Sequence, residues 1–465
     1  MKVHFNGAAQ TVTGSQYLFE INGKRLLLEC GLFQGKRADT YLKNQHFPFD
    51  PGTVDALILS HAHIDHSGNL PNLIKSGYRG LIYTTPGTAD LADIMLRDSG
   101  HIQEADALYV NKKRARRGEP PIEPLYTEAD ASRVKEHFKP VVYNQTFEPI
   151  PGVTAHLVDA GHILGSAAIV LDIKENGRSF RFWFSGDIGR ARLPLLNDPV
   201  LPVDTDYLMM ECTYGDKSHD DPETAYNEFR DMAIRTFKRG GKIIIPAFAV
   251  GRTQELVYSL NRMITNGDIK PIPVYVDSPL AVKASNIFRE HSEYFDEETR
   301  QFVLQGRHPA LDFKGLTYIA SVEESKALND KHEPMVIISA SGMAEAGRIL
   351  HHLKNNIENP RNTIAIVGWC APDTLGRRLA ERDMEVKIFG VRYERRAEIV
   401  TIGGYSAHAG QDQLLRYAAS SRNSLRQIIL IHAEEDAETA FRRKLEEARL
   451  PSVNYPNQAD VLEFI

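Results

Sequence analysis

The residues with the clearest chemical potential lie in one short stretch, residues 61–66, with the sequence HAHIDH. It holds three imidazoles and one carboxylate, the ligands that borderline divalent metals, and zinc above all, prefer in proteins. On a turn, His61 and His63 can point toward one metal while Asp65 and His66 face a second. A polar turn with an incidental histidine is the common alternative, but it does not account for this density of ligands. The stretch therefore predicts a metal site.

The sequence on either side predicts the elements that would position these ligands. Residues 54–60 form a largely apolar run, as in a buried strand. Residues 70–75 carry Pro71 near their start, which is typical of the first turn of a helix. The ligands would then occupy a strand-to-helix turn, where short side chains can converge on one point.

Two later strands end in potential ligands of the same kind. The apolar run 153–160 leads to His162, and the run 180–184 leads to Asp187, each beside glycine. Small neighbours leave room for a metal, although Gly-His and Gly-Asp turns are common and each signal alone is weak. Because they follow residues 61–66 in this order, we expect His162 and Asp187 to complete a ligand set.

An early hairpin ends in a further carboxylate. The dipeptide Asn22-Gly23 between two apolar runs is a strong hairpin signal, and Glu29 ends the second run. Its side chain is either a charge at a sheet edge or a carboxylate that orients a metal ligand from behind. The spacing alone leaves both interpretations open.

The distribution of strands and helices predicts the domain organisation. A chain of 465 residues is too long for one ordinary core. From residue 242 to 367, apolar strands alternate with helical segments, which is typical of an α/β domain with a parallel sheet. Short strands dominate before and after. We expect residues 1–210 and 385–465 to form one domain, with residues 211–384 inserted into it.

Composition limits the class of function. The hydrophobic fraction of 42% and the charged fraction of 25% are those of a soluble globular protein, with neither a membrane span nor a signal-peptide pattern. Three scattered cysteines argue against a disulfide framework and for the cytoplasm. A net charge of -6 requires any polyanion site to be local. The basic run 111–118 either flanks a phosphate groove or is a solvated helix face.

In order and spacing, these motifs resemble those of metallo-β-lactamase-fold nucleases of the β-CASP group, which includes RNase J and the pre-messenger-RNA 3′-end cleavage nuclease. The resemblance covers essentially the whole chain. Residues 61–66, His162 and Asp187 match the shared hydrolase motifs. The group's motifs A, B and C correspond to Glu211, His408 and His432.

Two stretches resemble family signatures of the inserted domain, residues 246–252 and 339–343. There are also departures from the family pattern. Glu29-Cys30 stands where the family usually has Asp-Cys, and Cys212 replaces the more usual Ser after motif A. Without the resemblance, a buried core histidine would be the simpler interpretation of both His408 and His432.

The resemblance implies an α/β fold, a metallo-β-lactamase αββα sandwich with an inserted β-CASP domain whose parallel sheet is flanked by helices. It also implies two zinc ions per chain. One zinc would be held by His61, His63 and His162, the other by Asp65, His66 and His432, with Asp187 bridging them.

The function implied is that of a zinc-dependent ribonuclease that hydrolyses single-stranded RNA, as an endonuclease, a 5′-3′ exonuclease or both. Two metals would activate a water, and His408, oriented by Glu211, would be the general acid, with Asp65 also taking part in proton transfer. We expect a cytoplasmic homodimer without membrane contact. Substrate phosphates would contact Arg252, Ser339, Ser341 and Gly342, for which ordinary turn chemistry is the alternative.

Two other functions compete with this one. A metallo-hydrolase of the same fold could act on DNA or on a small thioester or lactone, but the inserted domain and motifs A to C argue against the small substrates. A non-catalytic binding subunit could keep the fold without the metals, but the presence of all seven expected ligands argues against it.

Overall fold

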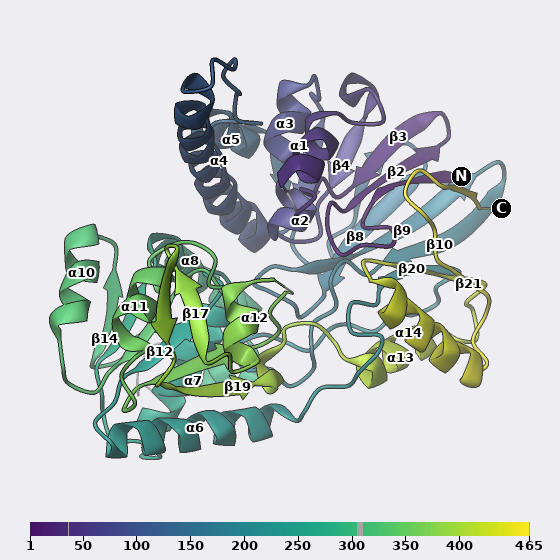
Figure 1. Cartoon of the computed structure of the whole chain (residues 1–465). Helices are drawn as coiled ribbons and strands as arrows, with labels where there is room; N and C mark the ends of the chain where they lie inside the picture. The colour runs from purple at the N-terminus through teal and green to yellow at the C-terminus, as the bar shows by residue number, and fades with distance from the viewer. Residues whose placement is uncertain (36, 305–309, 372, 465) are drawn as a thin grey trace. The chain divides into compact units, whose positions relative to one another are not determined.

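The computed structural model describes residues 1–35, 37–304, 310–371 and 373–464, and the chain divides into two compact units (Figure 1). The first unit comprises Met1–Ala191, Asp198–Ser218 and His408–Ile465. The second unit comprises Arg192–Asn197 and His219–Ala407.

The first unit contains two seven-stranded sheets. In spatial order, the strands of one sheet are β22 (Val461–Glu463), β1 (Lys2–Gly7), β2 (Gln16–Ile21), β3 (Lys24–Leu28), β4 (Ala56–Ile58), β5 (Leu81–Thr84) and β6 (Phe138–Pro140). β2 and β3 form the expected hairpin. Its turn residues Asn22 and Gly23 have φ values of 51° and 74°, the left-handed conformation that such a turn requires. From β3 to β6 the strands are parallel.

The second sheet mixes antiparallel and parallel strands. Its strands, in spatial order, are β21 (Val453–Asn454), β20 (Gln427–Ile431), β11 (Tyr207–Glu211), β10 (Arg178–Phe184), β9 (Ala167–Glu175), β8 (Val153–Asp159) and β7 (Phe147–Ile150). β10, β11 and β20 run parallel, and β8 and β9 are antiparallel neighbours. Since β8 and β10 both pair antiparallel with β9, they point the same way as β11 and β20.

Aromatic and aliphatic side chains from both sheets form one core between them. Phe19 of one sheet meets Phe182 of the other edge to face, with ring centroids 5.2 Å apart. The opposite face of the second sheet buries Trp183, whose Nε1 donates a hydrogen bond to Tyr417 on a covering helix at 2.7 Å. The helices over this face are α13 (Gln411–Ala419) and α14 (Glu435–Glu447).

Helices beside the first sheet complete the expected αββα sandwich (Figure 1). They are α1 (Arg37–Gln45), α2 (Ile64–Ser67), α3 (Leu70–Lys75), α4 (Pro86–Ala115) and α5 (Glu128–Ser132). Local sequence explains where the longest of them begins. Pro86 is its first residue, and the Thr85 side chain accepts the Thr88 N–H, a cap that satisfies an otherwise free donor.

The second unit contains a parallel sheet with helices around it, as the sequence alternation predicts. In spatial order its strands are β14 (Leu316–Ile319), β13 (Val274–Asp277), β15 (Val336–Ser339), β12 (Ile243–Pro246), β16 (Thr363–Val367) and β19 (Glu398–Ile402). All of these pairs are parallel. Its central strands are almost wholly aliphatic and buried, as expected of a sheet covered on both faces.

The helices of this unit are α6 (Pro222–Lys238), α7 (Arg252–Thr265), α8 (Pro279–Glu290), α9 (Glu297–Leu304), α10 (Val322–Asp330), α11 (Ile349–Asn356) and α12 (Leu375–Ala380). A separate antiparallel hairpin joins β17 (Glu385–Ile388) to β18 (Val391–Glu394). Among the helices of the described residues, none is both long enough and apolar enough to cross a membrane.

The compact units differ from the domain bounds expected around residue 385. The sequence analysis assigned residues 385–465 to the sandwich domain because short strands resume there. The structure places residues up to Ala407 in the second unit, because β19 hydrogen-bonds along its whole length with β16. The first unit likewise extends beyond residue 210, to Ser218.

Asp277, the last residue of β13, anchors the interior of the second unit. Its fully buried carboxylate accepts hydrogen bonds from Arg348 (2.6 Å), His352 (2.6 Å) and Ser325. Burial alone would raise the pKa of this carboxyl, but the three donors outweigh burial and hold it below its usual value. Such a group stabilises the fold above its unfolded-state pKa, and that contribution is lost as pH falls through the lower folded-state pKa.

We expect Asp277→Asn to lower the free energy of unfolding by about 3–5 kcal/mol, because it leaves Arg348 without its counter-charge. Urea unfolding at neutral pH measures this, and the difference from wild type should shrink below about pH 4. Glu381→Gln is the matched control, since Glu381 pairs with Arg377 at an exposed site and its loss should cost less than about 1 kcal/mol. Equal effects of the two substitutions would contradict the anchoring role.

Candidate metal centre

The side chains expected to bind metal come together at one edge of the first unit's sandwich. His61 follows β4, His162 follows β8 and Asp187 follows β10. Glu211 is the last residue of β11, and His432 directly follows β20. Because the strands of the second sheet that carry these residues point the same way, their carboxyl ends meet at one edge.

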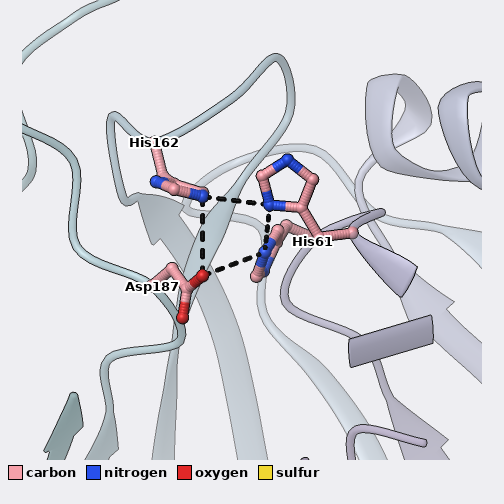
Figure 2. Close-up of side chains that lie close together, drawn as sticks. His61, His162 and Asp187 are labelled. Atoms are coloured by element: carbon pink, nitrogen blue, oxygen red, sulfur yellow. Dashed lines mark hydrogen bonds and ion pairs between the residues drawn. The ribbon is translucent and has the colours of Figure 1, made fainter. Parts of the chain in front are cut away.

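Three imidazole nitrogens and one carboxylate oxygen form a first group of donors (Figure 2). His63 Nδ1 lies 3.2 Å from His61 Nε2 and 3.1 Å from His162 Nε2. Asp187 Oδ2 lies 3.4 Å from His61 Nε2 and 3.5 Å from His162 Nε2. The labelled side chains thus point toward a common centre.

A second group of donors faces the other oxygen of Asp187. The short helix α2 carries two of its members, Asp65 and His66. His66 Nε2 lies 3.2 Å from Asp187 Oδ1 and 3.3 Å from His432 Nε2. His432 Nε2 is also 3.5 Å from Asp65 Oδ2. Asp65, His66 and His432 therefore form a cluster able to hold a metal.

Two observations show that these donors fit a metal. A tetrahedral zinc ion with bonds of about 2.0–2.1 Å separates its ligand atoms by about 3.3 Å, close to the 3.1–3.5 Å found in the first group. In addition, buried Asp187 Oδ1 forms no hydrogen bond within the described part of the chain, although His66 Nε2 lies 3.2 Å away. A buried carboxylate oxygen without a hydrogen bond is costly unless a cation or water satisfies it.

Burial prepares the imidazoles of the first group for ligation. It lowers the pKa of His61 to about 3, that of His63 to about 4, and that of His162 well below its usual value. Neutral imidazoles keep the lone pair that a metal needs. Burial alone would raise the pKa of Asp187, but the surrounding imidazoles, His66 foremost, hold it well below its usual value, so the carboxylate is negative.

Glu29 orients two residues of the centre from behind. Its carboxylate accepts a hydrogen bond from His66 Nδ1 at 2.6 Å, which leaves Nε2 to face Asp187. It also accepts the Ser60 N–H at 2.7 Å and the Ser60 hydroxyl at 2.9 Å. Ser60 Oγ lies 2.9 Å from His61 Nδ1. Of the two interpretations left open by the sequence, the structure favours the orienting carboxylate.

His408 stands beside the centre with one ring nitrogen fixed. Buried Glu211 lies 2.9 Å from its Nδ1, while its Nε2 lies 3.9 Å from Asp187 Oδ2. Burial would lower the pKa of His408, but the carboxylates of Glu211 and Asp187 outweigh it and raise that pKa to about 9. The ring is therefore held as an acid, 21% exposed, next to the donor groups.

Thr213 belongs to this network although the sequence analysis did not single it out. Its hydroxyl donates to Glu211 and lies 3.1 Å from His432 Nδ1. It therefore connects the Glu211–His408 pair to the second group of donors. The only signal in the sequence was its place two residues after Glu211, where a threonine is also ordinary turn chemistry.

Two of the four residues expected to bind substrate are already engaged inside the second unit. Arg252 is 8% exposed, pairs with Glu255 and lies over the Tyr405 ring, 5.7 Å from its centroid. Ser339 is buried and donates to the backbone carbonyl of Asp277 at 2.8 Å. Both side chains hold the fold of this unit together.

The other two residues, Ser341 and Gly342, are half-buried on the loop after β15. Ser341 Oγ accepts the Glu345 N–H at 3.2 Å. The basic run 111–118 covers the end of α4 and the turn after it. Arg114 pairs with Glu119 at 3.2 Å, but most of the run's other cationic side chains are exposed. The run therefore forms an exposed helix end, and both interpretations of its role stay open.

Three family models match successive parts of the chain. The model of the metallo-beta-lactamase superfamily matches residues 10–247, just over half of the 465 residues. The model of the Beta-Casp domain matches residues 253–379. A model described as a Zn-dependent metallo-hydrolase RNA specificity domain matches residues 392–456.

Individual proteins are similar along nearly the whole chain. Ribonuclease TTHA0252 from Thermus thermophilus is 37% identical, over 92% of this chain and 92% of that protein. Transcription termination factor FttA from Methanocaldococcus jannaschii is 31% identical, over 94% of this chain and 67% of that protein. An RNase J-like protein from the same organism is 29% identical, over 94% and 93%. A solved structure of a protein of unknown function from Enterococcus faecalis shares the fold, with a TM-score of 0.58, 13% identity and 99% coverage of both chains.

The geometry predicts how many metal ions each variant retains. Because Asp187 faces both groups of donors, Asp187→Ala should lower the zinc content more than His63→Ala or His432→Ala, each of which changes one group. Inductively coupled plasma mass spectrometry on zinc-loaded protein measures the ratio. His101→Ala, which changes an exposed histidine of α4, is the matched control and should match wild type. Full retention by Asp187→Ala would contradict the shared position of this carboxylate.

Proposed function

Because this chain belongs to the Beta-Casp group of metallo-β-lactamase-fold ribonucleases, we propose that it hydrolyses phosphodiester bonds of single-stranded RNA at a centre of two zinc ions. One observation carries the proposal. The two oxygens of Asp187 face two different groups of ligands, with Oδ2 toward His61 and His162 and Oδ1 toward His66. A single metal would not need both groups.

The ligand assignment follows these contacts. When bound, the two ions would acidify a water molecule and offset negative charge on the phosphate. We assign His61, His63 and His162 to one ion, Asp65, His66 and His432 to the other, and Asp187 to both.

His408 is the residue that we assign to protonating the leaving oxygen. Glu211 holds Nδ1, so Nε2 is the nitrogen left to face a substrate. The raised pKa of His408 keeps a proton on the ring at neutral pH, and a nearby cation would lower that pKa toward the range in which an acid catalyst works best. Thr213 supports this arrangement as a positioning residue, through its hydrogen bond to Glu211.

We assign Asp65 a second task besides ligation. Burial would raise the pKa of its carboxyl, but the hydrogen bond with His432 and the charge of His66 outweigh burial and hold it below the usual value. The carboxylate is thus ionised and can accept the proton of an attacking water at an oxygen. In the second unit, we assign phosphate contact to Ser341 and to the backbone of Gly342, and an internal role to Arg252 and Ser339.

His408→Ala should slow the chemical step by about 10²- to 10⁴-fold and leave both metal ions in place, because His408 belongs to neither group of ligands. Single-turnover cleavage of end-labelled RNA measures the rate, and metal analysis of the same sample checks the ions. Added free imidazole should recover part of the rate. Cleavage by His408→Ala at the wild-type rate would refute the assignment.

Substrate choice separates this function from its competitors. We expect zinc-loaded protein to cleave single-stranded RNA faster than single-stranded DNA, and to leave a small thioester intact. Parallel assays with the three substrates measure this, with Asp187→Ala as the control for contaminating nucleases. Hydrolysis of the thioester without cleavage of RNA would replace the proposed function. If the RNA is cleaved, product mapping on RNA bearing a 5′-monophosphate or a 5′-triphosphate distinguishes internal from end-directed cutting.

A further inference from the structure

Two large aromatic side chains are exposed at the carboxyl edge of the second unit's parallel sheet. Phe248 is 50% exposed and Trp369 is 48% exposed. Each stands two residues beyond the end of its strand, β12 for Phe248 and β16 for Trp369, and these two strands are neighbours. Of the two tryptophans in the chain, the other, Trp183, is only 1% exposed.

Contacts around Phe248 hold its ring in place. Its backbone carbonyl accepts hydrogen bonds from the Thr253 N–H at 3.2 Å and the Thr253 hydroxyl at 2.7 Å. The ring lies directly against Gly342, where an added Cβ would come within 3.0 Å of ring carbons. The absence of a side chain at Gly342 therefore lets the ring pack on that backbone while half of it stays exposed.

The loop that carries Trp369 packs on the same backbone. Gly368 donates to the Ile402 carbonyl at 3.1 Å, and its φ of 95° is a backbone conformation that glycine adopts readily. Beyond Trp369, the Gly376 N–H donates to the Met343 carbonyl at 2.9 Å. Phe248 and Gly376 thus both border the loop 339–343.

Position and chemistry together indicate what these rings bind. Single exposed apolar side chains are ordinary, but the carboxyl edge of a parallel sheet is where such domains bind ligands. Adjacent strands lie about 4.8 Å apart, so a short stretch of one RNA strand can reach both rings. The bases of single-stranded RNA offer flat faces that stack on aromatic side chains, whereas the bases of a duplex are already stacked on one another.

We propose that Phe248 and Trp369 form a base-stacking site for single-stranded RNA, beside the loop 339–343. This inference rests on the proposed function and adds a source of specificity to it. Stacking depends little on base identity, so the site would hold a strand irrespective of its sequence. It would also exclude duplexes.

Tryptophan fluorescence tests the site directly, because Trp183 is buried and only Trp369 can meet a base. Titration of zinc-loaded His408→Ala protein with oligouridine should quench the emission. An abasic strand of the same length and a duplex should leave it nearly unchanged. Trp369→Phe should abolish the quenching while binding the strand with nearly wild-type affinity, because a stacking ring remains.

Substitutions that remove a ring test the contribution to affinity. In the same His408→Ala background, Trp369→Ala and Phe248→Leu should each weaken oligouridine binding by about tenfold, as expected for the loss of one stacked base, with little change for the abasic strand. Phe389→Ala is the matched control, because Phe389 is equally exposed, at 54%, in the turn of the β17–β18 hairpin. It should bind like its parent.

The outcomes separate this inference from the proposed function. If the wild-type protein cleaves RNA but Trp369 emission does not respond and Trp369→Ala and Phe248→Leu bind normally, the stacking site is refuted and the ribonuclease function stands. If Trp369→Ala or Phe248→Leu changes the oligomeric state of the protein but not its RNA binding, the rings belong to a protein interface and the stacking site is also refuted. If the wild-type protein neither binds nor cleaves RNA, both fail.

Discussion

The carboxylate of Asp187 is the constraint on which the rest of the first unit depends. It is buried and negative, and its two oxygens face two separate groups of imidazoles. A buried charge of this kind is tolerated only where partners compensate for lost hydration. The surrounding structure can be understood as the means of holding those partners at 3.2–3.5 Å from one carboxylate.

The two-sheet sandwich satisfies this constraint by placing the donors at the ends of strands, on the turns after them, or on the short helix α2 that follows β4. The backbone at the end of a strand is held by the hydrogen bonds of the sheet, while the side chains just beyond it are free to face a ligand. A further set of residues, Glu29, Ser60 and Thr213, contacts the Nδ1 atoms of three of the histidines and so fixes the orientation of their rings. Without such partners an imidazole could rotate and present the wrong nitrogen. His408 gains the same control from Glu211.

Much of this arrangement could be predicted from the sequence, and the reasons differ from residue to residue. Residues 61–66 could be recognised as a metal-binding stretch because several potential ligands lie close together in the sequence. His162 and Asp187 could be proposed because they follow apolar strands beside glycine. His408 and His432 could not be distinguished from core histidines by spacing, and only the family resemblance pointed to them. Their role depends on long-range pairing, such as that of β11 with β20.

The remaining differences between the sequence-based expectations and the structure also have physical causes. Arg252 resembled a phosphate ligand, but the sequence could not show that Glu255 and Tyr405 already surround its guanidinium. Residues 385–407 resembled the strands of the sandwich, because a short strand does not reveal its partner until the sheet is assembled. In both cases a tertiary contact that the local sequence does not reveal accounts for the difference.

The most direct test of the account is anomalous diffraction from crystals of zinc-loaded protein, recorded on both sides of the zinc absorption edge. The account predicts two peaks about 3.5–4 Å apart, one next to Asp187 Oδ2 among His61, His63 and His162, the other next to Oδ1 by His66 and His432. A single peak, or two peaks of which neither touches Asp187, would contradict it.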